Sequence, residues 1–299
     1  MERTELPPLA GATGARRENL PALALLAPFL LAFLLFFLLP AVETLWLSLT
    51  ESSLTRTNAF VGLANYATLV HDASFWDALG NTFYFALLTV VPLTALGLLM
   101  ALLVNRFVAA QGWLQGVFFL PFVLPISVMT LIADWMLQPS SGIVNHLLGG
   151  QRPWLADPVW ALPAVAIGTV WWTVGFNMLL FLAGLRNIPA EQYEAAALDG
   201  ARGWTLFANI TWPALRPVTT TCLILQLIAS LKVFGQTYIL TTGGPFNTSC
   251  VTLHYMYETA FTQSDAGYAA AIAMAFVAIV VMLSLLQAGI VRWLAGRHA

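Results

Sequence analysis

The sequence predicts an all-α membrane protein, a bundle of six transmembrane helices with both termini in the cytoplasm. Hydrophobic residues make up 59% of the 299 residues and charged residues only 9%, whereas soluble domains are about half apolar and a quarter charged. The apolar residues gather in runs of about 20 or more, the length that a helix needs to cross a bilayer core about 30 Å thick. Basic residues lie mainly on one side of these runs.

The predicted elements follow one another within a single domain, residues 21–299, after a polar cytoplasmic tail, residues 1–20. We expect transmembrane spans at residues 21–47, 79–104, 116–137, 159–185, 218–240 and 267–293. The first run exceeds the roughly 7–15 apolar residues of a signal peptide, so we expect it to be retained. Prolines inside the runs are tolerated as kinks in a membrane bundle. Loops rich in turn-forming residues separate the spans.

Positive charge orients the bundle. With the N-terminus in the cytoplasm, only Arg56 and Arg152 fall in outer loops, and Lys232 falls within the fifth span. The inner segments hold Arg3, Arg16, Arg17, Arg106, Arg186, Arg202, Arg216, Arg292 and Arg297. This bias places residues 186–217 in the cytoplasm.

The residue pattern argues against an enzyme acting on its own. The only lysine, Lys232, is followed by Val233, so the Gly-Lys-[Ser/Thr] sequence of a P-loop is absent. We expect no metal site, because the histidines are far apart, and no catalytic residue, because no G-x-S-x-G sequence occurs. His146, His254 and Glu258 fall in outer loops, where we expect solvated side chains. The net charge of −2 argues against nucleic-acid binding.

Residues 186–217 form a polar segment between the fourth and fifth spans. Asn187-Ile188-Pro189 predicts a helix start, and Gly200 predicts its end because glycine readily takes the left-handed conformation. Glu191 and Glu194 share a helix face near the positive end of the helix dipole. A second helical pattern covers residues 204–210. On physical grounds alone, an interfacial amphipathic helix explains this segment more simply than a docking element does.

The spacing of particular residues in this segment resembles a family signature. Glu194-Ala195-Ala196, Gly200 and Ile210-Thr211-Trp212-Pro213 are similar to the EAA–Gly–Ile-x-Leu-Pro pattern of the membrane subunits of bacterial binding-protein-dependent ABC importers, with Trp212 in place of Leu. The sugar-permease branch, which imports maltose, lactose, trehalose and glycerol-3-phosphate, has segments similar to residues 60–66, 118–121, 181–185 and 238–245. The resemblance covers about residues 22–293.

The resemblance implies the fold of a type I ABC importer permease in the bacterial cytoplasmic (inner) membrane. It implies a second permease subunit, two copies of a cytoplasmic ATPase that bind ATP and Mg, and an extracytoplasmic substrate-binding protein, with no cofactor in this chain. Coupling to the ATPase would involve Glu191, Glu194, Ala195, Ala196, Gly200, Ile210 and Pro213.

Polar residues inside the spans are candidates for the translocation path. Lys232 and Gln236 are four residues apart and would share a face of the fifth span, while Asp134 and Asn177 lie in the third and fourth spans. Lys232 could contact the solute or form an ion pair with Asp134. Asp134 could also reach the outer interface, and interhelical hydrogen bonding is the alternative for Gln236 and Asn177.

We therefore expect a carbohydrate permease subunit that works by alternating access. An ATP-independent secondary transporter is one alternative, and it predicts discontinuous helices in two repeated halves. A membrane scaffold without a translocation path is the other.

Overall fold

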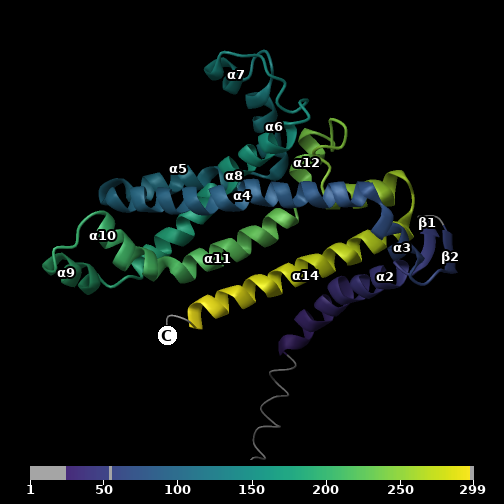
Figure 1. Ribbon diagram of the computed structural model, residues 1–299, viewed down its shortest axis with the longest axis horizontal. Helices are drawn as coiled ribbons and strands as arrows, with labels where there is room; N and C mark the ends of the chain where they lie inside the picture. The colour runs from purple at the N-terminus through teal and green to yellow at the C-terminus, as the bar shows by residue number, and fades with distance from the viewer. Residues whose placement is uncertain (1–24, 54–55, 297–299) are drawn as a thin grey trace, which may run out of the picture.

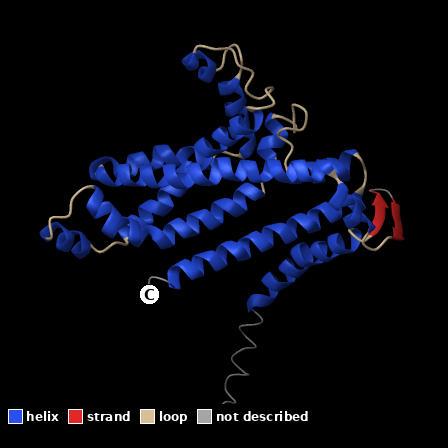
Figure 2. Ribbon diagram, in the orientation of Figure 1, coloured by secondary structure: helices blue, strands red, loops and turns tan. Residues whose placement is uncertain are grey.

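The computed structural model describes residues 25–53 and 56–296 (Figure 1). Nearly all of this part is helical, with one small antiparallel sheet (Figure 2). Within residues 25–53 and 56–296, five helices are long and apolar enough to cross a membrane, or six if one bent pair counts as a single span. The all-α membrane class is thereby confirmed. The tail predicted at residues 1–20 lies outside the described residues.

The elements of the first half run from the first span to the short helix α7. Their bounds are η1 Leu34–Leu38, α2 Leu39–Leu47, β1 Thr50–Ser53, β2 Arg56–Phe60, α3 Ala64–His71, α4 Ala73–Arg106, η2 Val108–Ala110, α5 Gln111–Val123, α6 Ile126–Leu137 and α7 Ile143–Leu148. Residues 25–47 form one apolar helix that contains the π-helical turn η1. No residue of α2 is buried.

The second half contains the remaining long helices. Their bounds are α8 Ala161–Arg186, α9 Ala190–Leu198, α10 Trp204–Leu206, η3 Phe207–Thr211, α11 Trp212–Leu231, α12 Gly235–Leu240, α13 Thr252–Tyr257, η4 Glu258–Thr262 and α14 Ala266–Gly296. α9 and α10 lie at one end of the bundle and β1 and β2 at the other, while α6 and α7 project sideways from α4 (Figure 1).

Helices α4, α5 and α8 pack through small residues. A Cβ atom on Gly97 of α4 would lie 2.7 Å from the Cβ of Asn177 on α8. A Cβ atom on Gly175 of α8 would overlap the carbonyl oxygen of Phe118 on α5. Small residues at such crossings let helix backbones approach closely, which is how membrane helices gain packing energy.

The third span is not the single helix expected at residues 116–137. α5 and α6 are bent by 98° at a break where Leu124 is extended and Pro125 caps α6. Proline lacks the amide hydrogen needed to continue the helix and pushes the preceding residue out of helical geometry. The indole Nε1 of Trp172 donates to the Leu124 carbonyl at 3.2 Å, so this carbonyl keeps a partner.

The fifth span also differs from the expected residues 218–240. It starts earlier, because residues 204–231 form one helical stretch, and it ends at Leu231. Phe234 then has φ −150° and ψ −60°, and a new helix, α12, starts at Gly235. Lys232 and Gln236 therefore do not share one face of a continuous helix.

At the end of the bundle that carries β1 and β2, one carboxylate links three elements. Asp72 Oδ1 accepts from the Ser74 amide at 2.9 Å and caps α4. Its Oδ2 accepts from the hydroxyls of Tyr255 at 2.6 Å and Tyr268 at 2.5 Å. Burial raises the pKa of Asp72, but these hydrogen bonds outweigh burial and leave the pKa below its ordinary value. The cluster ties the start of α4 to α13 and α14.

His254 is not a solvated loop residue as expected. Its side chain on α13 is 0% exposed and meets the rings of Phe234 and Tyr238 edge-on at 6.1 and 5.3 Å. Its Nε2 lies 3.4 Å from Glu258 Oε1, and neither ring nitrogen makes a hydrogen bond within the described residues. Burial lowers the pKa of His254, although Glu258 acts in the opposite direction. Local residues around His254 did not indicate this burial, because the covering rings belong to α12 and to its N-cap residue Phe234.

Candidate functional site

The polar segment 186–217 carries the predicted helix, now α9, and its glycine stop. Gly200 has φ +78°. The Ala201 amide donates to the Ala196 carbonyl at 2.9 Å and the Gly200 amide to the Ala197 carbonyl at 3.0 Å. This pair of bonds is the Schellman arrangement, which needs a residue that tolerates the left-handed conformation. At the other end, the cap is Pro189, the last residue of the predicted helix start Asn187-Ile188-Pro189.

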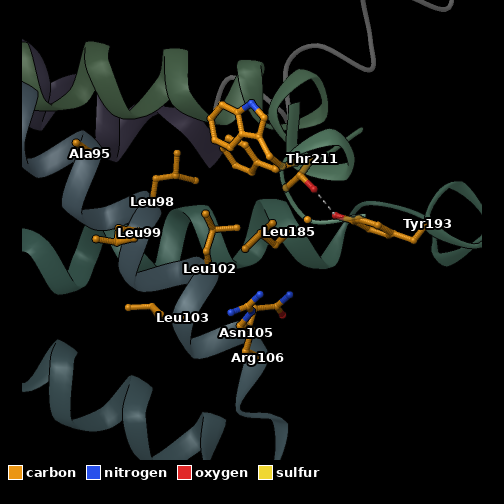
Figure 3. A pocket seen from close by; sticks show the side chains of 13 residues that line it. Ala95, Leu98, Leu99, Leu102, Leu103, Asn105, Arg106, Leu185, Tyr193 and Thr211 are labelled. Atoms are coloured by element: carbon orange, nitrogen blue, oxygen red, sulfur yellow. Dashed lines mark hydrogen bonds between the residues drawn. The ribbon is translucent and has the colours of Figure 1, made fainter. Parts of the chain in front are cut away.

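α9 divides into an exposed and an inward face. Glu191, Glu194 and Ala195 are exposed, whereas Ala196 is only 9% exposed. The Tyr193 hydroxyl lies 3.2 Å from Thr211 Oγ1 (Figure 3), which ties α9 to the start of the fifth span. The carboxylates therefore point away from the bundle and are free to meet another surface.

The second helical pattern, expected at residues 204–210, is α10 followed by the π-helical turn η3, and it runs directly into α11. Ile210 is half-buried in η3, and Pro213 is the second residue of α11. Pro213 has no amide hydrogen to donate to the Asn209 carbonyl, which lies within the wider turn. Residues 204–231 thus form one helical unit that joins the end of the polar segment to the fifth span, so a displacement of either part would be felt by the other.

Two of the four candidates for the translocation path meet at a cavity of about 340 Å³. Its walls come from α4, α5, α8, α11 and α12, and it is lined by Phe85, Leu93, Phe122, Thr169, Trp172, Thr173, Gln226, Ala229, Ser230, Lys232, Val233 and Gln236. The rings of Phe122 and Phe176 stack at 5.0 Å, and Trp172 lies 6.4 Å from Phe122. Hydroxyl, amide, ammonium and aromatic groups are therefore gathered in one space.

Asn177 lies beside this cavity rather than in its lining. Gln226 Nε2 donates to Asn177 Oδ1 at 3.1 Å, and both side chains are buried. The interhelical bond proposed as an alternative for Asn177 is therefore present, between α8 and α11. Sequence reasoning missed Gln226, although an amide inside an apolar run is itself a signal of a buried polar contact.

The possible ion pair between Lys232 and Asp134 is not formed. Among the described side chains, the one contact within 4 Å between a basic side chain and a carboxylate is the pair His254–Glu258. Asp134 is exposed on α6, which the 98° bend directs away from the straight path expected for the third span. Lys232, also exposed, lines the cavity without a carboxylate.

Comparison with known proteins identifies the family. The family described as "Binding-protein-dependent transport system inner membrane component" matches residues 93–296. The probable ABC transporter permease protein YurN of Bacillus subtilis is 36% identical over 266 residues, covering 86% of this chain and 91% of YurN. The trehalose/maltose transport system permease protein MalF of Thermococcus litoralis is 36% identical over 265 residues, covering 86% and 89%.

A further relative and a solved structure agree with this assignment. The lactose transport system permease protein LacF of Rhizobium radiobacter is 32% identical over 271 residues, covering 87% of this chain and 90% of LacF. A chain of a bacterial ABC transporter that imports the acidic polysaccharide alginate has the same fold, with a TM-score of 0.82, 23% identity, and coverage of 92% and 96%. This chain belongs to the family of inner membrane components of binding-protein-dependent transport systems, the permease proteins of ABC transporters.

Proposed function

We propose that this chain is a permease subunit of an ABC importer and forms, with a second permease, the translocation path for a carbohydrate. The observation that carries the proposal is the cavity that brings Lys232 and Gln236 together with Trp172 and Phe122. The trehalose/maltose and lactose permeases among its relatives support the same class of solute.

The cavity has the chemistry that a sugar requires. Hydroxyl groups of a sugar both donate and accept hydrogen bonds, which the amide of Gln236 and the hydroxyl of Ser230 can satisfy, while the Lys232 ammonium donates. Phe122 and Trp172 offer apolar ring faces to the C–H face of a sugar ring. An ammonium without a carboxylate also suits a solute that carries a phosphate, such as one of the glycerol-3-phosphate type.

The exposed face of α9 would dock on a separate ATPase, which would bind ATP and Mg, so that this chain is not itself an enzyme. Two copies of that ATPase would serve the pair of permeases. Glu191 and Glu194 are exposed on this face, where they could pair with basic residues of the ATPase. The same reading places both termini and α9 in the cytoplasm, and a substrate-binding protein at the opposite, outer end.

Alternating access would use the two breaks that flank the cavity. The path elements α5–α6 and α11–α12 are both interrupted, at Leu124–Pro125 and at Lys232–Phe234. The ATP-independent alternative also predicts interrupted helices, but membership of the permease family favours a partner ATPase.

Reconstitution of the full chain with its second permease, ATPase and binding protein in proteoliposomes tests this function. The panel of radiolabelled solutes contains mono- and oligosaccharides and glycerol-3-phosphate. We expect uptake of at least one of them, and only when ATP is present on the side of the vesicle membrane that carries the ATPase. Uptake that continues without the ATPase would support the secondary transporter. ATP hydrolysis without uptake of any solute would support the scaffold.

A further inference from the structure

A second, larger hollow lies at the end of the bundle that carries α9 and α10. It is separate from the cavity lined by Lys232 and Gln236, which we call the path cavity. This second hollow has a volume of about 760 Å³ and is walled by the last turns of α4, the end of α8 and the polar segment 186–217 (Figure 3). It is lined by Ala95, Leu98, Leu99, Leu102, Leu103, Asn105, Arg106, Leu185, Tyr193, Gly203, Trp204, Phe207 and Thr211. We call it the α4 groove.

One wall of the α4 groove is a continuous apolar strip. Leu98, Leu99, Leu102 and Leu103 follow one another on α4, and Leu99 and Leu103 are 52% and 48% exposed. From Ala95 to Leu103 a helix rises about 12 Å. A strip of this length and chemistry matches a hydrocarbon chain better than a polar solute.

The mouth of the groove is cationic. Arg106 is the last residue of α4, and no carboxylate is among the lining residues. Within the described part of the chain, its guanidinium makes no ion pair or hydrogen bond. Trp204, at the same groove, is 77% exposed, as expected for a tryptophan at the level of the lipid headgroups.

We infer that the α4 groove binds one anionic phospholipid of the bilayer, with an acyl chain along the leucines of α4 and the phosphate at Arg106. Basic pockets between transmembrane helices at the cytoplasmic side are suited to anionic headgroups. Charge decides between the possible occupants, because an apolar helix seated in the groove would leave the guanidinium of Arg106 without an anion.

The bound lipid would also contact the polar segment 186–217. Tyr193 and Thr211, which join α9 to η3, line the same groove as the leucines of α4. An acyl chain in the groove therefore fills the space between the bundle and the element proposed to meet the ATPase. Anionic lipid would hold α9 in its position against the bundle.

Native mass spectrometry of the purified full complex, equilibrated with palmitoyl-oleoyl phosphatidylglycerol and the matching phosphatidylcholine, tests this site. We expect preferential retention of phosphatidylglycerol, with the preference reduced about fivefold in Arg106→Gln and kept in Arg106→Lys. Arg186→Gln is the matched control, since Arg186 is an exposed arginine at the end of α8 that does not line the groove. Equal retention of the two lipids by the unmodified complex, or an equal loss in both glutamine variants, would overturn the inference.

The occupant can be captured directly. p-Benzoylphenylalanine in place of Leu99 should crosslink to phospholipid on irradiation, with a preference for phosphatidylglycerol. Leu96 is 41% exposed on α4 but outside the groove lining. The same group in place of Leu96 should crosslink to phospholipid without that preference. Crosslinking of position 99 to the second permease or to residues 1–24 would contradict a lipid site. Neither measurement depends on transport, so a failed sugar assay and a failed lipid assay remain distinguishable.

Discussion

Lys232 lies where α11 ends, and its ammonium has no carboxylate partner among the described side chains. If it donates to the solute, Lys232→Ala should lower uptake efficiency about tenfold, the usual effect of losing a hydrogen bond from a charged group. Uptake kinetics measured with the reconstituted complex will show the change. Lys232→Arg, which keeps the charge, should retain more activity.

A structural role for Lys232 predicts a different result. Lys232→Ala would then lower the unfolding temperature while the uptake efficiency of the folded protein stays normal. Thermal unfolding of both variants, measured beside transport, separates the two roles.

His254 makes stability depend on pH. Its pKa lies below the ordinary 6.5 because the ring is buried, so the unfolded chain binds a proton at a higher pH than the folded one does. Stability is then full above about pH 6.5 and falls as the pH drops below it, by at most about 1.4 kcal/mol per pH unit. Thermal unfolding between pH 7.5 and 5.5 measures this loss.

His254→Leu is the informative variant. Leucine suits the apolar surroundings of Phe234 and Tyr238 and cannot be protonated. The unfolding temperature of this variant should therefore change less between pH 7.5 and 5.5. Asp72 acts in another window, because a lowered carboxyl pKa removes stability only as the pH falls below about 4. The same slope in His254→Leu as in the unmodified chain would show that another group titrates.

At the scale of elements, the crossing of α5 and α8 depends on Gly175. A methyl group there would overlap the Phe118 carbonyl, so Gly175→Ala should destabilise the chain by about 1–3 kcal/mol through forced separation of the helices. Gly116→Ala on α5 is the matched control, since nothing lies within 4 Å of its Cβ position and alanine favours a helix by about 1 kcal/mol. Thermal unfolding in detergent compares the two. Equal unfolding temperatures would mean that α5 moves aside without loss.

The sequence predicts where helices lie better than where they break. Proline occurs inside α4, α5 and α11 at Pro92, Pro121 and Pro217 without ending any of them, yet Pro125 starts a new helix at a sharp bend. Composition does not distinguish these prolines, because neighbouring helices decide which kink is tolerated. At Leu231 neither a proline nor a glycine follows directly, so the end of α11 was not predictable from local residues.

Local chemistry did predict α9. Gly200 and the helix formers before it specify a short helix and its stop through contacts within about a dozen residues, and these are present. The path residues needed tertiary information. Lys232 and Gln236 reach one cavity by flanking a break rather than by sharing a helix face, and Asp134 is carried away from Lys232 by the bend before α6.

At the scale of the whole molecule, one helical unit, residues 204–231, links the two proposed working surfaces of the chain. Exposed α9 is tied through Tyr193 and Thr211 to the stretch that continues as α11, and α11 supplies Gln226 and Ser230 to the path cavity. A displacement of α9 by an ATPase therefore has a direct mechanical route to the cavity. The resemblance to the permease family predicted this assembly, while composition and periodicity predicted only a helical membrane protein.

That route makes Glu194→Lys the decisive change. Glu194 is exposed on α9, so reversing its charge should leave the fold intact but repel a basic docking surface, lowering ATP-driven uptake about tenfold or more, the effect of juxtaposing like charges at an interface. Glu51→Lys, at an exposed acid of β1 at the opposite end, is the control for surface charge and should leave co-purification of the ATPase unchanged. Co-purification of the ATPase, ATP hydrolysis and sugar uptake should be measured together.

Lost uptake with an intact complex means that coupling has failed, and lost co-purification means that docking has failed. Unchanged uptake in Glu194→Lys would remove the Glu194 face of α9 from the coupling mechanism.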